Sequence, residues 1–121
     1  KKLKQTLVLP IGRMSEEIKN FLKSNKVLDF GLEVKQKKFE FKEKYAILPN
    51  SLVASYALGI ATSGKAKRIL LAGFDGYPGD DPRTVEMDEV LSLYRKFSKK
   101  TKILSITPTR FKVESVSIYA L

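Results

Sequence analysis

Three short segments hold the polar side chains best suited to binding or chemistry. The first is Asn50-Ser51, the second is the loop of residues 73–83, and the third is residues 105–110. In an open parallel sheet, ligands bind beyond the carboxyl ends of the strands. Each segment follows an expected strand, so we predict that all three lie at one rim. The side chains predicted to bind a ligand there are Asn50, Ser51, Asp75, Gly76, Thr107, Thr109 and Arg110.

The first and third segments each allow a structural alternative. A helix that begins near Ser51 would offer free backbone N–H groups to a phosphate or carboxylate. Asn and Ser are also favoured as ordinary helix N-caps. Arg110 could clamp an anion through two parallel hydrogen bonds, or pair with the acidic loop as a purely structural contact. Both alternatives stay open at this point.

The loop of residues 73–83 is the most informative segment. Asp75 directly follows an expected strand, where its carboxylate could reach a sugar hydroxyl, a ribose or a metal-bound water. The glycines at 73, 76 and 79 permit tight turns and close approach of the backbone. Asp80, Asp81 and Glu86 are better explained by capping of the next helix. A calcium-binding EF-hand spacing does not occur, and no metal ligand is assigned in this domain, although a looser magnesium site stays open.

Composition excludes several classes of chemistry. The 121 residues contain no cysteine and no histidine, so a disulfide framework, thiolate metal sites and Ser-His or Cys-His catalysis are excluded. Phosphate-binding and nucleophile motifs with characteristic glycine spacing do not occur. No apolar run reaches the 18–20 residues of a membrane span. We therefore expect a cytoplasmic protein with no membrane partner.

The net charge of +10 is unevenly distributed. Residues 1–44 and 95–121 each carry a net charge of +6. Residues 74–94 hold six acidic side chains and one basic side chain, a net charge of −5. The lysines are spread along polar faces without interleaved aromatic residues, which is typical of solvated surface rather than of a nucleic-acid interface. We expect no nucleic-acid partner.

Alternating strands and helices with short loops predict an α/β fold, a three-layer Rossmann-like sandwich with a largely parallel sheet. Residues 68–73 are apolar without alternation and should form a strand covered on both faces. Thr84 is expected to cap a long amphipathic helix, and residues 116–119 to form a last strand, with Tyr119 in the core. The other strands are expected within 5–9, 27–30, 39–41, 45–48 and 102–106, and the other helices within 15–25 and 51–64. We expect residues 1–121 to form a single α/β domain.

Several runs together resemble a known domain. The runs 51–61, 69–77 (ILLAGFDGY), 80–83, 86–87, 105–110 and 117–120 resemble the C-terminal domain of 4-hydroxy-2-oxovalerate aldolase-like proteins of bacterial surface-polysaccharide clusters. In that family an HMG-CoA lyase-like barrel precedes this domain and carries the divalent metal and the lyase chemistry. The resemblance implies that this chain is the C-terminal part of a longer protein, with that barrel as a partner and no cofactor of its own. A fainter likeness, in fold only, is to the nucleotide-sugar side of bacterial sialyltransferase-like folds.

The expected function is that of an accessory domain in surface-carbohydrate biosynthesis, which binds an anionic sugar or nucleotide sugar at the rim. One alternative is a docking or dimerisation module that binds no ligand. Another is a small metal-dependent glycosyl- or nucleotidyl-transferase-like domain.

Overall fold

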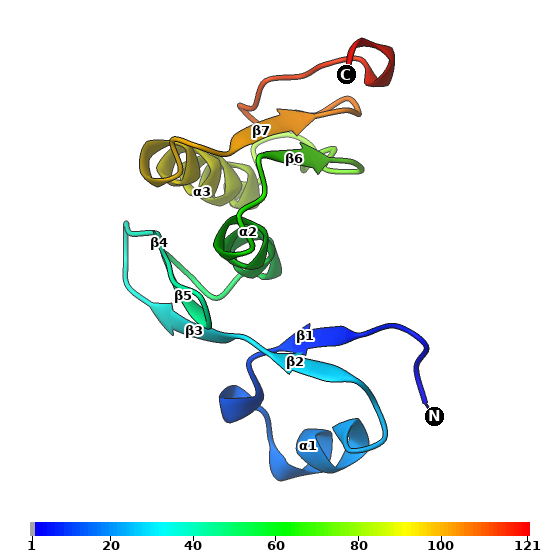
Figure 1. The fold of residues 1–121 in the computed structure, drawn as a ribbon. Coiled ribbons are helices and arrows are strands. Elements are labelled where there is room, and N and C mark those ends of the chain that lie inside the picture. Colours follow the sequence, from blue (N-terminus) through cyan, green and yellow to red (C-terminus); the bar gives the residue numbers. More distant parts are fainter. Residues whose placement is uncertain (1) are drawn as a thin grey trace.

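A computed structural model describes residues 2–121 and shows mixed helix and strand content (Figure 1). Its elements follow one another in an order that repeatedly places a helix between two strands. They are β1 (Leu7–Leu9), the 3-10 turn η1 (Ile11–Arg13), α1 (Glu16–Leu22), β2 (Val27–Asp29), β3 (Gly31–Val34), β4 (Glu40–Phe41), β5 (Tyr45–Leu48), α2 (Val53–Ser63), β6 (Arg68–Leu71), α3 (Pro82–Phe97), β7 (Lys102–Ser105) and η2 (Ile118–Ala120).

The strands form three small sheets. β1 pairs with β2 in parallel, β5 lies between parallel β3 and antiparallel β4, and β6 pairs with β7 in parallel. The α/β content and the parallel pairings agree with the sequence. The expected sandwich is built around one larger sheet, whereas no strand pairing joins the three sheets among residues 2–121.

The N-terminal lobe, residues 2–29, consists of β1, η1, α1 and β2. As predicted, Ser15 caps α1, because its side chain accepts a hydrogen bond from the amide of Ile18. Of the apolar stripe on α1 only Leu22 is buried, while Ile18 and Phe21 are 43% and 53% exposed. This helix therefore covers little of its own sheet.

The middle sheet and α2 pack closely together. Adding a Cβ at Gly59 of α2 would bring it within 3.0 Å of the Ala46 Cβ and 3.1 Å of the Leu48 side chain. Glycine at this position lets the helix backbone approach β5. Ala46 and Leu48 are completely buried in consequence.

The C-terminal lobe, residues 68–121, is a parallel strand–helix–strand unit with a long tail. α3 buries four side chains against the rest of the molecule: Met87, Val90, Leu91 and Tyr94. The tail returns beside β7, where Ser105 and Ser115 form an isolated parallel bridge. Tail and helix are also joined, because the amide of Lys112 donates to the Asp88 carboxylate at 2.7 Å.

Three expectations for this lobe are wrong. β6 is not covered on both faces, because Leu70 is 38% exposed. α3 is capped by Asp81 rather than by Thr84, since Pro82 suits the first helical turn and the Asp81 carboxylate accepts from the Arg83 amide. Residues 118–120 form a 3-10 turn, and Tyr119 is 97% exposed rather than in the core.

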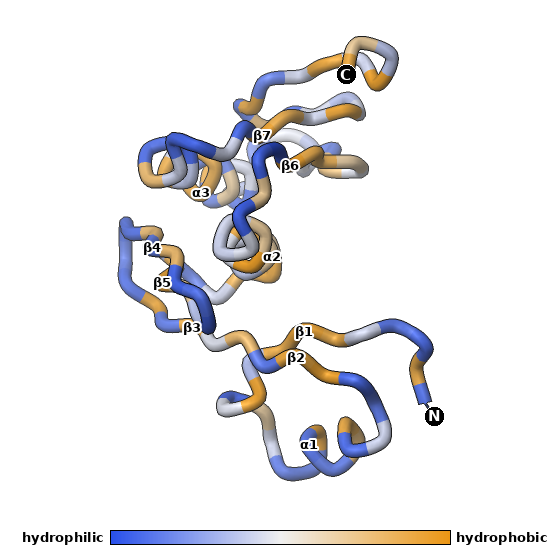
Figure 2. Tube along the Cα trace, in the orientation of Figure 1, coloured by the Kyte–Doolittle hydropathy of each residue, from blue (hydrophilic) through white to orange (hydrophobic). Residues whose placement is uncertain are grey.

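One apolar core joins the middle sheet, α2 and the C-terminal lobe. Its buried members include Phe39, Leu48, Leu58, Leu91 and Ile103. Figure 2 shows the same pattern along the chain, with apolar residues on the strands and polar residues in the connections between them. Of residues 2–29, Val8 alone packs against this cluster.

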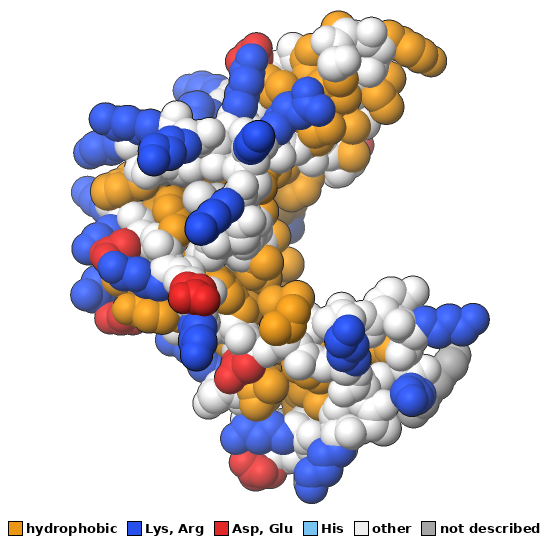
Figure 3. Space-filling view, viewed as in Figure 1, with side chains coloured by type: hydrophobic (Ala, Val, Ile, Leu, Met, Phe, Trp, Pro, Cys, Tyr) orange, Lys and Arg blue, Asp and Glu red, His pale blue; other side chains and the backbone are white. Residues whose placement is uncertain are grey.

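The molecule is open in shape rather than compact. Figure 3 shows a hollow side between the N-terminal lobe and the C-terminal tail, with apolar side chains along it. The accessible surface is 8495 Å², against about 6,600 Å² for a typical folded monomer of this mass. The chain thus exposes roughly 1,900 Å² more surface than a compact protein of its size.

None of the helices in residues 2–121 is both long enough and apolar enough to cross a membrane.

Candidate functional site

A cavity of about 610 Å³ lies between the start of α2, the loop that follows β6, and α3. Its walls come from segments far apart in the sequence. They are formed by Leu52, Val53, Ala54, Gly73, Phe74, Asp75, Gly76, Tyr77, Met87 and Phe111. We call this the rim cavity, because it lies beyond the carboxyl end of β6, where ligands bind in parallel α/β sheets.

The loops after β6 and β7 are joined at the edge of the rim cavity. The Gly73 amide donates to the Thr107 hydroxyl at 2.9 Å, and the Arg110 amide donates to the Asp75 carbonyl at 2.9 Å. The second and third segments of the sequence therefore lie side by side.

Gly76 is the tightest point of this junction. Its φ of +96° is one that side chains rarely adopt. A Cβ added there would lie 2.8 Å from the Arg110 Cβ, which is closer than such atoms approach. Only glycine therefore allows the two loops to pack as they do.

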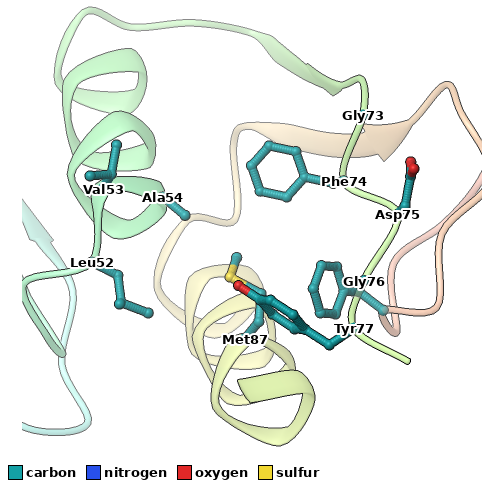
Figure 4. A pocket seen from close by; sticks show the side chains of 10 residues that line it. Leu52, Val53, Ala54, Gly73, Phe74, Asp75, Gly76, Tyr77 and Met87 are labelled. Atoms are coloured by element: carbon teal, nitrogen blue, oxygen red, sulfur yellow. The ribbon is translucent and has the colours of Figure 1, made fainter. Parts of the chain in front are cut away.

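The interior of the rim cavity is apolar and aromatic. The Tyr77 and Phe111 rings meet nearly edge-on, with centroids 6.2 Å apart at 69°. Figure 4 shows the side chains of Leu52, Phe74, Tyr77 and Met87 directed into the space, whereas the Asp75 carboxylate points away from it. The walls are therefore better suited to stacking against a planar ring than to binding a charged group.

A cationic group lies on one of these rings. The Arg83 guanidinium carbon is 4.2 Å from the Tyr77 ring centroid, and the same guanidinium pairs with the Asp81 carboxylate at 2.7 Å. Hydrogen bonds from the Arg83 side chain and amide lower the pKa of Asp81 to about 2. Arg83 and Asp81 therefore stay charged at neutral pH and fix Tyr77 from outside the cavity.

The first predicted segment does not share the cavity as expected. The Asn50 side-chain oxygen accepts from the Leu52 amide at 3.2 Å and from the Ser55 hydroxyl at 2.7 Å. Asn50 lines a separate hollow of about 250 Å³ beside Lys37. These contacts form a turn just before α2, so Asn50 acts structurally here, although it is not the N-cap of the helix.

Three further predicted site residues, Ser51, Thr109 and Arg110, do not line the rim cavity either. Ser51 is exposed, and α2 begins two residues later with Leu52 at the N-cap and no side-chain cap. The Thr109 hydroxyl accepts from the Phe111 amide at 3.1 Å, which sets the turn that brings Phe111 into the cavity. Arg110 is exposed and belongs to none of the ion pairs found within residues 2–121.

The structure adds residues that sequence reasoning missed. Of the predicted site residues, Asp75 and Gly76 line the rim cavity, while Thr107 and Arg110 shape its edge. The missed residues are the apolar ones, including Phe74 and Tyr77. Two aromatic residues within a glycine-rich loop were the available signal, because a solvated loop gains nothing from such side chains.

In the part of the chain that the structure describes, no group of three or more acidic side chains is placed to hold a metal ion.

Comparison of the chain with protein-family models, with curated proteins and with solved structures gives no match.

Proposed function

We propose that the chain is an accessory binding domain for an anionic sugar or nucleotide sugar, which it holds in the rim cavity. The observation that carries this proposal is the cavity itself. It joins an aromatic wall, formed by Phe74, Tyr77 and Phe111, to the start of α2.

Each side of the cavity suits a different part of such a ligand. A nucleobase, or the apolar face of a sugar ring, gains free energy by stacking on aromatic side chains. The first amides of a helix have no partner within the helix and favour a phosphate or carboxylate. No side chain caps α2, and Val53 and Ala54 of its first turn line the cavity.

The wider setting is part of the proposal and is supported by the sequence resemblance. β6 and β7 are parallel and are connected through α3, and this arrangement supports the Rossmann-like sandwich that we propose as the structural frame. The parent protein would be an aldolase-like lyase of surface-carbohydrate biosynthesis in the cytoplasm, whose barrel carries the catalytic metal. These parts of the proposal rest on the resemblance of residues 51–120.

Titration calorimetry with CMP, UDP-sugars and sialic-type acids tests the proposal. We expect one of these ligands to bind, and Tyr77→Ala to weaken that binding about tenfold, as loss of one stacked ring should. Asp75→Ala should weaken it less, because its carboxylate points out of the cavity. Tyr45→Ala is the control, since this ring is 40% exposed on β5. Absence of binding by any of them at millimolar concentration would contradict the proposal.

A second candidate function is self-association, and the open shape favours it. The excess surface of roughly 1,900 Å² is more than the 800 Å² or so that each partner buries in a standard interface. The C-terminal tail adds three exposed apolar side chains, with exposures of 57% at Ile118, 97% at Tyr119 and 46% at Leu121. A second copy of the chain could cover this surface.

Light scattering coupled to size exclusion tests this candidate. If the tail forms the contact, the chain should run as a dimer, and Ile118→Ser combined with Tyr119→Ser should shift it toward monomer. Val85→Ser is the control, because Val85 is 62% exposed on α3 rather than on the tail. A monomer at high micromolar concentration would exclude the dimer, and ligand binding by that monomer would leave the first proposal standing.

A further inference from the structure

A second cavity of about 610 Å³ opens at the other end of β6 and β7. It is lined by the connection that follows α2 and the connection that follows α3, together with Phe41, Thr62 and Phe97. Each of these connections leads into the start of a strand, whereas the rim cavity lies beyond the end of β6. We call it the lysine hollow, because its lining includes Lys65, Lys67, Lys99 and Lys100.

The positive charge of the lysine hollow is unbalanced. Its lining contains no acidic side chain, and none of the four lysines belongs to the ion pairs found in residues 2–121. By contrast, Lys38 and Lys42 both pair with Glu40, at 2.9 and 2.6 Å. Figure 3 shows Lys and Arg side chains gathered over the end of α3 and around β6 and β7.

The negative ends of two helix dipoles offset only part of this positive charge. α2 and α3 both end at the lysine hollow, and the carbonyl end of a helix carries about half a negative elementary charge. Two such ends offset about one of the four positive charges. The remaining charge has no partner in the described part of the chain.

Lys65 occupies a backbone conformation that favours glycine. Its φ is +62°, while the neighbouring Gly64 has a φ of −74°. The turn is fixed by hydrogen bonds from Lys65 N to Thr62 O at 2.9 Å and from Ala66 N to Ala61 O at 3.0 Å. A helix commonly ends with glycine at this position. A lysine there gives up some stability and gains a cation at the mouth of the hollow.

The floor of the lysine hollow is well ordered by hydrogen bonds. The Thr62 and Tyr94 hydroxyls are 2.7 Å apart, and the Ser98 hydroxyl lies 3.3 Å from that of Tyr94. The Thr101 hydroxyl donates to the Ala66 carbonyl at 2.8 Å and so ties the two lysine-bearing connections together. The two connections that carry the four exposed lysines are thus held side by side.

We propose that the lysine hollow binds a small soluble anion carrying two or more linked phosphate groups. Lysine ammonium groups contact phosphate oxygens as point charges from several directions. A diphosphate reaches lysines on both connections at once, whereas a single phosphate engages fewer of them. This site is distinct from the rim cavity and does not depend on the function proposed there.

Titration calorimetry of the full chain with inorganic pyrophosphate, tripolyphosphate and orthophosphate tests this proposal. We expect pyrophosphate and tripolyphosphate to bind more tightly than orthophosphate, and Lys65→Gly to weaken pyrophosphate binding about three- to fivefold. The midpoint of thermal unfolding should stay unchanged or rise, because glycine suits a φ of +62°.

Lys37→Gly is the matched control. Lys37 has a φ of +58°, so the substitution removes the same charge and changes the backbone in the same way outside the hollow. Lys99→Ala with Lys100→Ala should weaken binding further than Lys65→Gly, and Tyr77→Ala should leave it unchanged. Equal weakening by Lys37→Gly, or no pyrophosphate binding at millimolar concentration, would overturn the proposal.

Discussion

Replacing Gly76 by alanine is expected to lower the free energy of unfolding by about 3 kcal/mol. The left-handed backbone costs a side chain about 1–2 kcal/mol, and overpacking adds about 1–3 kcal/mol. Both apply here, because φ is +96° and the new Cβ would lie 2.8 Å from the Arg110 Cβ. Urea denaturation followed by circular dichroism measures the change.

Two further variants separate the backbone cost from the steric cost. Gly79 also has a positive φ, of +62°, but no atom lies within 4 Å of the Cβ that alanine would add. Gly79→Ala should therefore cost only about 1–2 kcal/mol. Arg110→Gly removes the opposing Cβ and should recover part of the loss in the Gly76→Ala background. If alanine at positions 76 and 79 lowered the free energy of unfolding equally, the loops after β6 and β7 would have to move apart without cost.

Tyr94→Ala is expected to destabilise the protein by about 4 kcal/mol, in the range for truncation of a buried aromatic ring. Tyr94 is 0% exposed, and its ring packs edge-on against Phe39 at 5.7 Å and Phe41 at 6.1 Å. Tyr94→Phe keeps these ring contacts but removes the hydroxyl that pairs with Thr62 at 2.7 Å. That variant should cost about 1–2 kcal/mol, because a partly buried hydroxyl loses its partner.

Tyr119→Phe is the matched control for the hydroxyl, since Tyr119 is 97% exposed. It should change the free energy of unfolding by less than about 0.5 kcal/mol. Thermal and urea unfolding of the four proteins, wild type included, measure these differences. A Tyr94→Phe variant as stable as the wild type would mean that water replaces the phenol oxygen without loss.

Sequence reasoning located the elements better than it located their surroundings. Ser15 with its following glutamates, and the apolar runs at β5 and β7, were sufficient to place α1 and the strands. Burial depends on tertiary neighbours that no local pattern contains. Leu70 belongs to an apolar run typical of a covered strand, but its side chain is 38% exposed.

The candidate site was predictable in part for the same reason. Ligands bind beyond the carboxyl ends of parallel strands, and this rule correctly predicted that the loops of Gly73 and Thr107 lie side by side. A hydrogen bond joins the two loops. That rule gives no information on side-chain direction. Asp75 was therefore predicted to bind a ligand at the rim, although its carboxylate points away from the rim cavity. Asn50 was ambiguous from the start, because a turn residue and a ligand residue at a helix start look alike in sequence.

The division of the strands into three sheets has a consequence for how the molecule comes apart. The backbone hydrogen bonds between strands stay within each sheet, so the loss of one sheet need not disrupt another. Residues 2–29 carry one ladder, and their contacts with the common core are the Val8 side chain and the Leu9 carbonyl, which accepts from the Phe30 amide at 3.1 Å. Such a segment opens at a small fraction of the global unfolding free energy. We therefore expect the N-terminal lobe to open before the rest of the molecule, so that limited proteolysis should cut first between α1 and β2, around Lys23 and Ser24.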